Sequence, residues 1–209
     1  MRLLGVTWVI ISMRILYGFA LDAHHWGWFD GLPDAGLGLG ISLLCLVGLN
    51  VGLAQRHDDD AIAAQATLIL LLVGSAAGGL YGEFGVAVMI AIGTLVLHGM
   101  ALLRGTGNLA SLGIASSYLW VGIHALSDDW VVLGLHLVPL EDDLLTFLLM
   151  AAITGMNAVM ATRFAHHENW FSTGLHAVGV GRPGLWAVSV GLGMVGATLS
   201  VAANRADVG

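Results

Sequence analysis

Polar positions divide the chain into long apolar blocks. Most blocks contain about 20 mainly apolar residues, which is the length a helix needs to cross the hydrocarbon core of a bilayer. Turn-forming and charged residues separate one block from the next. We therefore expect seven membrane-spanning helices, at about 3–21, 35–55, 61–81, 85–103, 108–126, 144–162 and 183–203.

Two features qualify this pattern. The apolar run WVVLGLHLVPL at 130–140 is too short to span, so we expect it to lie along the interface or to dip partway in. The first block carries Arg14 inside its apolar core and is followed by equally apolar blocks, so we expect a spanning helix rather than a cleavable signal. The prediction is an all-α, polytopic helical bundle, a single transmembrane domain over 1–209 in the cell membrane.

Composition agrees with a membrane protein. The chain is 57% hydrophobic and only 10% charged, with a mean hydropathy of +0.87. Soluble domains carry about 25% charged residues. No block of the chain is left that has the composition of a separate soluble domain.

Missing residue types exclude several functions. All basic residues are arginine, so the lysine needed for a retinal Schiff base is absent and covalent retinal binding is excluded. Cys45 is the single cysteine, which excludes an intrachain disulfide and a thiolate metal cluster. The formal charge is −7 without basic patches, so nucleic acid is not an expected partner. This acidic, lysine-free surface is typical of halophiles.

Charged residues predict the orientation. With seven spans, one side of the membrane receives Arg2, Arg56, Arg104, Arg163 and Arg182. The loops of the other side contain no arginine, and only the C-terminal tail adds Arg205 there. Arginine-rich loops stay in the cytoplasm, so we expect a cytoplasmic N-terminus and an external C-terminus. Most acidic residues would then face outward, including Glu83 and Asp128.

Arg14 is the first candidate site residue. An arginine near the centre of a spanning helix costs about 2.5–3.5 kcal/mol on insertion scales, so it needs a partner. Tyr17 and Thr7 share its helical face, which should point into the bundle. Three kinds of partner stay open: groups of the chain itself (Glu83, Asp22 or backbone carbonyls), a small anionic or dipolar ligand, and another subunit.

Two later blocks carry polar stripes on single helical faces. In 108–126 the stripe recurs at Gly113, Ser117, Trp120, His124 and Ser127. In 144–162 it consists of Thr146, Met150, Thr154 and Asn157. Facing stripes predict either a small hydrophilic cleft, lined by Ser117, His124 and Asn157, or hydrogen bonds that only join the helices.

The predicted outer loops combine imidazoles with carboxylates. Neutral histidine and carboxylate side chains bind Zn²⁺, Cu²⁺ and similar ions. If the loops approach one another, they predict a divalent-metal site, whose ligands would be His24, His25, His136 and Asp128. The alternative is a solvated acidic face, because the spacing matches no established metal motif.

Three functions follow from these residues. The first is a transport or ligand-binding bundle in which Arg14 and Tyr17 hold a small polar or anionic group, with Ser117, His124 and Asn157 along its approach. The second is a non-catalytic subunit of a larger membrane complex, such as a respiratory or redox complex. The third is a metal-dependent membrane enzyme that acts through the outer loops. The expected partners are the lipid bilayer and either partner subunits or further copies of the chain.

Overall fold

A computed structural model of the chain describes residues 81–127, 130–132 and 135–206, and seven single positions before them. Six of these positions are helical. Cys45, Gly48 and Gly52 fall in the predicted span 35–55, and Ala64, Leu68 and Leu71 fall in the predicted span 61–81. The predicted span 3–21 lies outside the described residues, whereas Trp26, the seventh position, lies in a turn.

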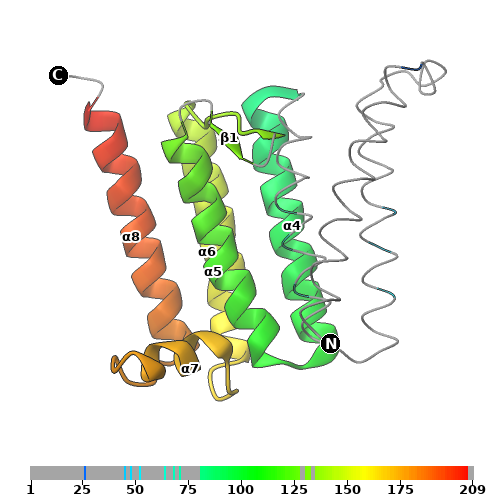
Figure 1. Cartoon of the computed structure of the whole chain (residues 1–209), viewed down its shortest axis with the longest axis vertical. Helices are drawn as coiled ribbons and strands as arrows, with labels where there is room; N and C mark the ends of the chain where they lie inside the picture. The colour runs from blue at the N-terminus through cyan, green and yellow to red at the C-terminus, as the bar shows by residue number, and fades with distance from the viewer. Residues whose placement is uncertain are drawn as a thin grey trace.

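Five helices and one short hairpin make up the described part of the chain: α4 (Gly82–Arg104), α5 (Gly107–Leu126), β1 (Val131–Val132), β2 (Leu135–His136), α6 (Asp143–Arg163), α7 (Trp170–Ala177) and α8 (Leu185–Ala206). Figure 1 shows α4, α5, α6 and α8 running along the bundle, while α7 lies across one end. We call this end the α7 end and the opposite end, where β1 and β2 lie, the hairpin end. The all-α class is confirmed.

Helix α5 is the centre of the described bundle, since it contacts α4, α6, α7 and α8. Its buried residues Leu109, Ile114 and Val121 join one apolar core with residues of α4 and α6. Large apolar side chains also cover the outside, including Leu103 and Phe147. A helix that is apolar all round is typical of a membrane span.

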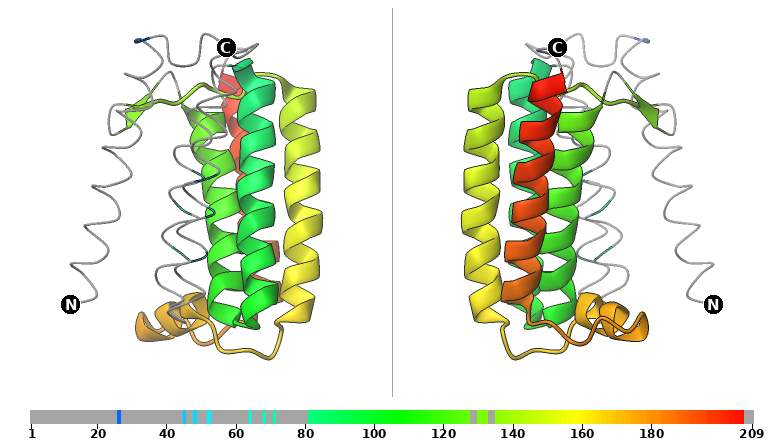
Figure 2. Two further views of the ribbon diagram at one scale, coloured as in Figure 1. Left: turned by 90° about the vertical axis from the view of Figure 1, so that its right-hand side faces the viewer. Right: turned by 90° about the vertical axis from the view of Figure 1, so that its left-hand side faces the viewer.

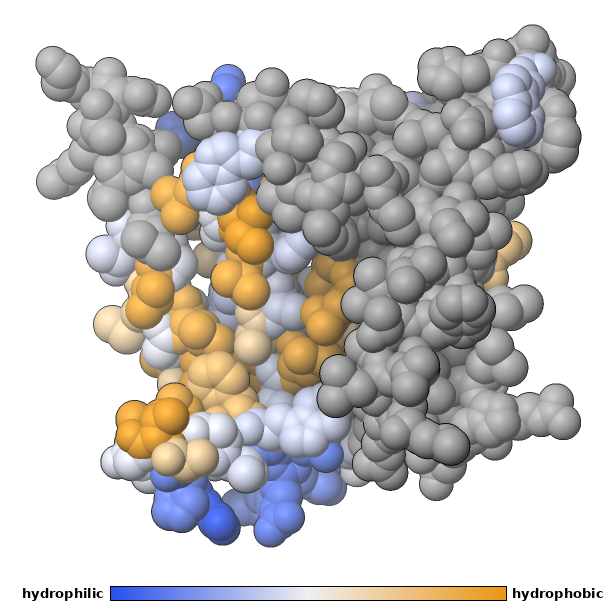
Figure 3. All heavy atoms as spheres, in the orientation of Figure 1, coloured by the Kyte–Doolittle hydropathy of each residue, from blue (hydrophilic) through white to orange (hydrophobic). Residues whose placement is uncertain are grey.

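Within the described residues, three helices are long and apolar enough to cross a membrane: α4, α5 and α6. Their length and composition indicate that the protein associates with a membrane. In Figure 3, hydrophobic surface lies along the helices and hydrophilic surface gathers beneath α7. The bounds of these three helices lie within three residues of the predicted spans.

Local sequence explains where the helices begin and end. Gly105 adopts a left-handed conformation with φ of 64°, and its N–H donates to the carbonyl of Ala101, which closes α4. The Asp142 carboxylate caps α6 by accepting from the N–H groups of Leu144 and Leu145 at 2.9 and 3.0 Å. These caps satisfy backbone groups that the helix itself leaves unpaired.

The apolar run 130–140 does not span. It forms the antiparallel hairpin of β1 and β2 and then an extended segment leading to α6. The N–H of Leu140 donates to the carbonyl of His124 at 3.1 Å, so the segment is tied to the end of α5. Leu137 and Leu140 are buried there, and this burial explains the apolar composition of a segment that is not a helix.

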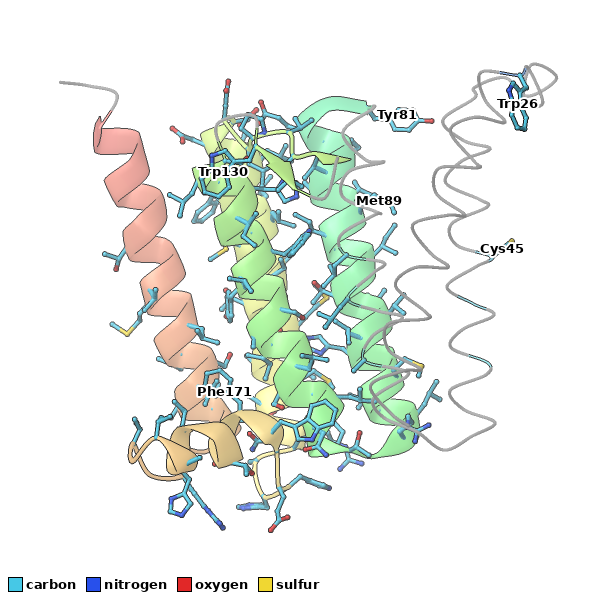
Figure 4. The ribbon with its side chains drawn as sticks, viewed as in Figure 1. Trp26, Cys45, Tyr81, Met89, Trp130 and Phe171 are labelled. Carbon is cyan, nitrogen blue, oxygen red and sulfur yellow. The ribbon has the colours of Figure 1, made fainter. Side chains whose placement is uncertain are left out.

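The two ends of the bundle differ in charge. Helices α4 and α6 both end at the α7 end, and the arginines there are Arg104, Arg163 and Arg182 (Figures 1 and 2). The hairpin end carries the carboxylates of Glu83, Glu141, Asp142 and Asp143. Aromatic side chains lie near both ends: Figure 4 shows Tyr81 and Trp130 at the hairpin end and Phe171, which belongs to α7, at the other end.

Candidate functional site

A buried hydrogen-bonded cluster, which we call the polar centre, joins three helices through His98 of α4, Ser117 of α5 and Asn157 of α6. His98 Nε2 lies 2.8 Å from Asn157 Oδ1. Asn157 Nδ2 donates to Ser117 Oγ at 3.0 Å. Ser117 and Asn157 are completely buried and His98 is 4% exposed, so the centre is shielded from solvent.

The proton positions in the polar centre are assigned from its hydrogen-bond network. Ser117 Oγ accepts from Asn157 Nδ2 and donates to the carbonyl of Ile114 at 3.0 Å. This carbonyl is a closer acceptor than Asn157 Oδ1, which lies 3.4 Å from the hydroxyl. The amide orientation that satisfies this network turns Asn157 Oδ1 toward the histidine. An amide oxygen is an acceptor, so His98 Nε2 carries the proton in the neutral imidazole. The second ring nitrogen, Nδ1, is then left with an unprotonated lone pair.

This lone pair is buried without a hydrogen-bond partner. Nδ1 lies against the backbone of Gly113, where a Cβ would come within 2.7 Å of it. Gly113 therefore gives the imidazole the space it occupies between α4 and α5. A buried nitrogen with a free lone pair can accept a hydrogen bond or a proton from a ligand that reaches it.

The polar centre is well inside the bundle. Asn157 precedes the end of α6 by six residues, and Ser117 follows the start of α5 by ten. At 1.5 Å per residue these positions are about 9 and 15 Å from the α7 end. Polar groups at such depth in a membrane protein are expensive and are functional candidates for that reason.

His124 forms a separate site on the same face of α5. It follows Ser117 by seven residues, or about 10 Å along the helix axis. Its Nδ1 lies 2.8 Å from the carbonyl oxygen of Val138, so Nδ1 donates and Nε2 has the lone pair. His124 is completely buried, and Nε2 has no hydrogen-bond partner. The hairpin segment therefore covers this histidine.

The polar stripes of α5 and α6 are brought together. Ser117 and Asn157 are hydrogen-bonded to each other across the two helices. A second contact joins them through a residue outside the predicted α5 stripe, because Tyr118 Oη donates to Thr154 Oγ1 at 3.3 Å. The closed geometry of these contacts agrees with hydrogen bonds that join the helices.

His98 was not among the site residues predicted from sequence. Its signal is spacing: Thr94 and His98 are polar residues four positions apart in an otherwise apolar helix. Thr94 is buried too, but it donates only to the carbonyl of Ile90 in its own helix, at 2.8 Å. Spacing alone does not reveal that only the histidine reaches α6.

The other predicted site residues are not tested by the structure. Arg14, Tyr17, His24, His25 and Asp128 lie outside the described residues. For His136 the structure describes the backbone, which pairs with Val131 in the hairpin.

Metal ligands do not gather in the part of the chain that the structure describes: it contains no group of three side chains able to hold a metal ion. Of the ligands predicted from sequence, His24, His25 and Asp128 lie outside the described residues, and His136 is described only in its backbone. The predicted metal site stays a prediction.

Glu83, one predicted partner of Arg14, stabilises the hairpin end through two hydrogen bonds. Its Oε2 accepts from the N–H groups of Glu141 and Asp142 at 2.9 and 2.8 Å. This carboxylate fastens the start of α4 to the segment that leads into α6. A charged acceptor suits both donors because charge-assisted hydrogen bonds are the stronger kind.

A comparison of the chain with models of protein families, with curated proteins and with solved structures found no match. The function must therefore be argued from the residues of the bundle itself.

Proposed function

We propose that the chain is a multi-pass membrane protein that binds or transports a small polar or anionic group inside its helical bundle. The observation that carries this proposal is the polar centre, a fully buried histidine, serine and asparagine joining α4, α5 and α6. A cluster used only to join helices has no need of a titratable ring with a free nitrogen. Such a nitrogen accepts a hydrogen bond from a neutral ligand and, once protonated, donates one to an anion.

Arg14 and Tyr17 are proposed to supply the charge that the polar centre lacks. An arginine within a span is costly unless it is paired, and an anion paired with it would be held away from water. His124 is proposed as a second polar position on the route, nearer to the hairpin end. Its free Nε2 supports this role.

Seven spans with a cytoplasmic N-terminus and an external C-terminus belong to the same proposal. The distribution of charge supports it, since Arg104, Arg163 and Arg182 lie at the α7 end and Glu83 and Glu141 at the other. Arginine-rich ends face the cytoplasm. The α7 end would then be cytoplasmic.

Flux measurements test the proposal. The full chain is reconstituted in proteoliposomes, and uptake of chloride and of formate is compared with that of empty liposomes. We expect Asn157→Ala and Ser117→Ala to lower the flux severalfold, because they remove polar groups that position His98. Ser116→Ala is the matched control, since Ser116 is buried on the same helix but donates only to carbonyls of α5. Flux no greater than in empty liposomes, together with no effect of either anion on thermal stability, overturns the proposal.

The role of Arg14 is tested separately in the same assay. We expect Arg14→Ala to abolish anion flux, because no other arginine is predicted within a span. Flux that survives this substitution unchanged would remove the arginine from the mechanism. Purification in mild detergent with mass spectrometry of bound proteins then separates transport from the role of a subunit, since a stable solitary chain counts against a larger complex.

A further inference from the structure

A second polar site lies at the α7 end, apart from the polar centre. A cavity of about 350 Å³ opens between the loop after α6, the first turn of α7 and the segment before α8. The lining residues used below are His166, His167, Glu168, Ser172, Thr173 and Arg182. We call this cavity the α7 pocket.

The α7 pocket is rich in hydrogen-bond donors. Arg182 is exposed and forms no ion pair with Glu168, although both line the same cavity. Asn169 caps α7 by accepting from the backbone N–H of Ser172 at 2.8 Å. Ser172 also lines the pocket, and its hydroxyl is not used by this cap. An arginine with nearby hydroxyl and imidazole groups is a common arrangement for binding phosphate oxygens.

The walls of the pocket are held in place. Gly107, at the start of α5, packs against the backbone carbonyl of Glu168, and a side chain there would collide with it. Thr173 Oγ1 donates to the carbonyl of Asn169 at 3.0 Å. The loop that contributes the histidines and the helix that contributes the hydroxyls are therefore both anchored.

Large apolar side chains are exposed at the same end of the bundle as the pocket. Trp170 begins α7 and is half-exposed, and Val178 and Val180, just after α7, are 73% and 66% exposed. Figure 2 shows that α7 lies across the end of the long helices rather than along them. A short helix with exposed apolar residues and a tryptophan is typical of the membrane interface, so the pocket is at the level of lipid headgroups.

We propose that the α7 pocket binds the phosphodiester headgroup of a lipid. Arg182 and the Ser172 hydroxyl hold the phosphate oxygens, and Val178 and Val180 lie among the acyl chains. Glu168 makes a bare phosphate a poor ligand and selects a headgroup that carries its own donor, such as the hydroxyls of phosphatidylglycerol. The same phosphate chemistry occurs in soluble phosphate esters, so the test separates the two sources.

Native mass spectrometry of the full chain in detergent tests this site, with phosphatidylglycerol and with glycerol phosphate as probes. We expect Arg182→Gln to weaken phosphatidylglycerol binding about tenfold, the effect of losing a charge-assisted hydrogen bond. Arg163→Gln is the matched control, because Arg163 is an exposed arginine at the same end but outside the pocket. Its binding should equal that of the unmodified chain.

Three outcomes decide the proposal. Equal losses in both variants indicate general attraction of anionic lipid to this end and overturn it. Glycerol phosphate bound as tightly as the lipid places the ligand in solution and also overturns it. Loss in Arg182→Gln alone, with unchanged thermal stability, supports it. Glu168→Gln should then reduce the preference for phosphatidylglycerol over phosphatidic acid, which lacks the headgroup hydroxyls.

Discussion

His98 and His124 share one arrangement at two levels of the bundle. Each ring uses one nitrogen as a donor, to Asn157 Oδ1 or to the Val138 carbonyl, and each buries the other nitrogen without a partner. A buried polar atom without a partner carries a desolvation cost of about 1–3 kcal/mol. A ligand or a proton bound to each of these nitrogens would remove the two costs, because each nitrogen would then have a partner.

The space around His98 gives a prediction at the scale of one residue. We expect Gly113→Ala to lower the thermal stability of the solubilised protein, because its Cβ would meet His98 Nδ1 at 2.7 Å and force the ring to move. Overpacking of this kind costs about 1–3 kcal/mol. Thermal unfolding in detergent measures the effect.

The matched control is Gly122→Ala on the same helix. A Cβ at Gly122 meets no atom within 4 Å, so alanine there should raise stability through its better helix propensity, by up to about 1 kcal/mol. Gly113→Ala variants that melt at the same temperature as Gly122→Ala variants would contradict the contact with His98.

Part of the polar centre could be predicted from sequence, and the reason is periodicity. Ser117 and Asn157 recur on polar faces of their helices, and they do meet. His124 lies on the same face as Ser117, but it pairs with the carbonyl of Val138. Periodicity states which residues share a face of one helix. It carries no information on which face of a third helix lies opposite, so the contribution of His98 had to come from the structure.

The helices, like the polar centre, could be predicted from the sequence only in part. Apolar length predicted α4, α5 and α6 closely, because a membrane span is defined by length and hydropathy. Helix α7 falls between the predicted spans 144–162 and 183–203, where no helix was predicted. Its eight residues contain too few turns for a periodic pattern, although Asn169 is a good N-cap. The hairpin was equally hidden within an apolar run.

Glu83 gives a prediction at the scale of the elements. We expect Glu83→Ala to free the segment before α6, since the two N–H groups of Glu141 and Asp142 lose their acceptor. A net loss of about 1 kcal/mol corresponds to about fivefold faster amide exchange in this segment. Hydrogen–deuterium exchange followed by mass spectrometry measures it.

The control for this prediction is Glu141→Ala. The Glu141 side chain is exposed, and the hydrogen bond to Glu83 comes from its backbone, so exchange in the segment should stay the same. Faster exchange in both variants would mean that acidic charge at the hairpin end stabilises the segment, rather than the two hydrogen bonds that Glu83 accepts.

At the scale of the whole molecule, charged side chains lie at the two ends of the described bundle and apolar surface lies between them. Three arginines and Glu168 lie at the α7 end, and four carboxylates lie at the hairpin end, where Arg205 falls in the last turn of α8. Apolar side chains lie on the faces between the two ends (Figure 3). The α7 pocket and the polar centre lie at different levels of the bundle, one at the α7 end and one about 9–15 Å from that end. A polar or anionic group entering from the α7 end would pass from the first level to the second.

The orientation itself is open to a direct test because the chain has one cysteine. In a Cys45→Ser background, Glu141→Cys places a thiol at the hairpin end and Ala177→Cys places one on α7, and both positions are exposed. We expect a membrane-impermeant maleimide to label Glu141→Cys in intact cells and Ala177→Cys only after permeabilisation, since arginine-rich ends stay in the cytoplasm. The reverse pattern would place the α7 pocket outside the cell and the acidic hairpin end within it. Labelling of both positions in intact cells would mean that α5 and α6 do not cross the membrane.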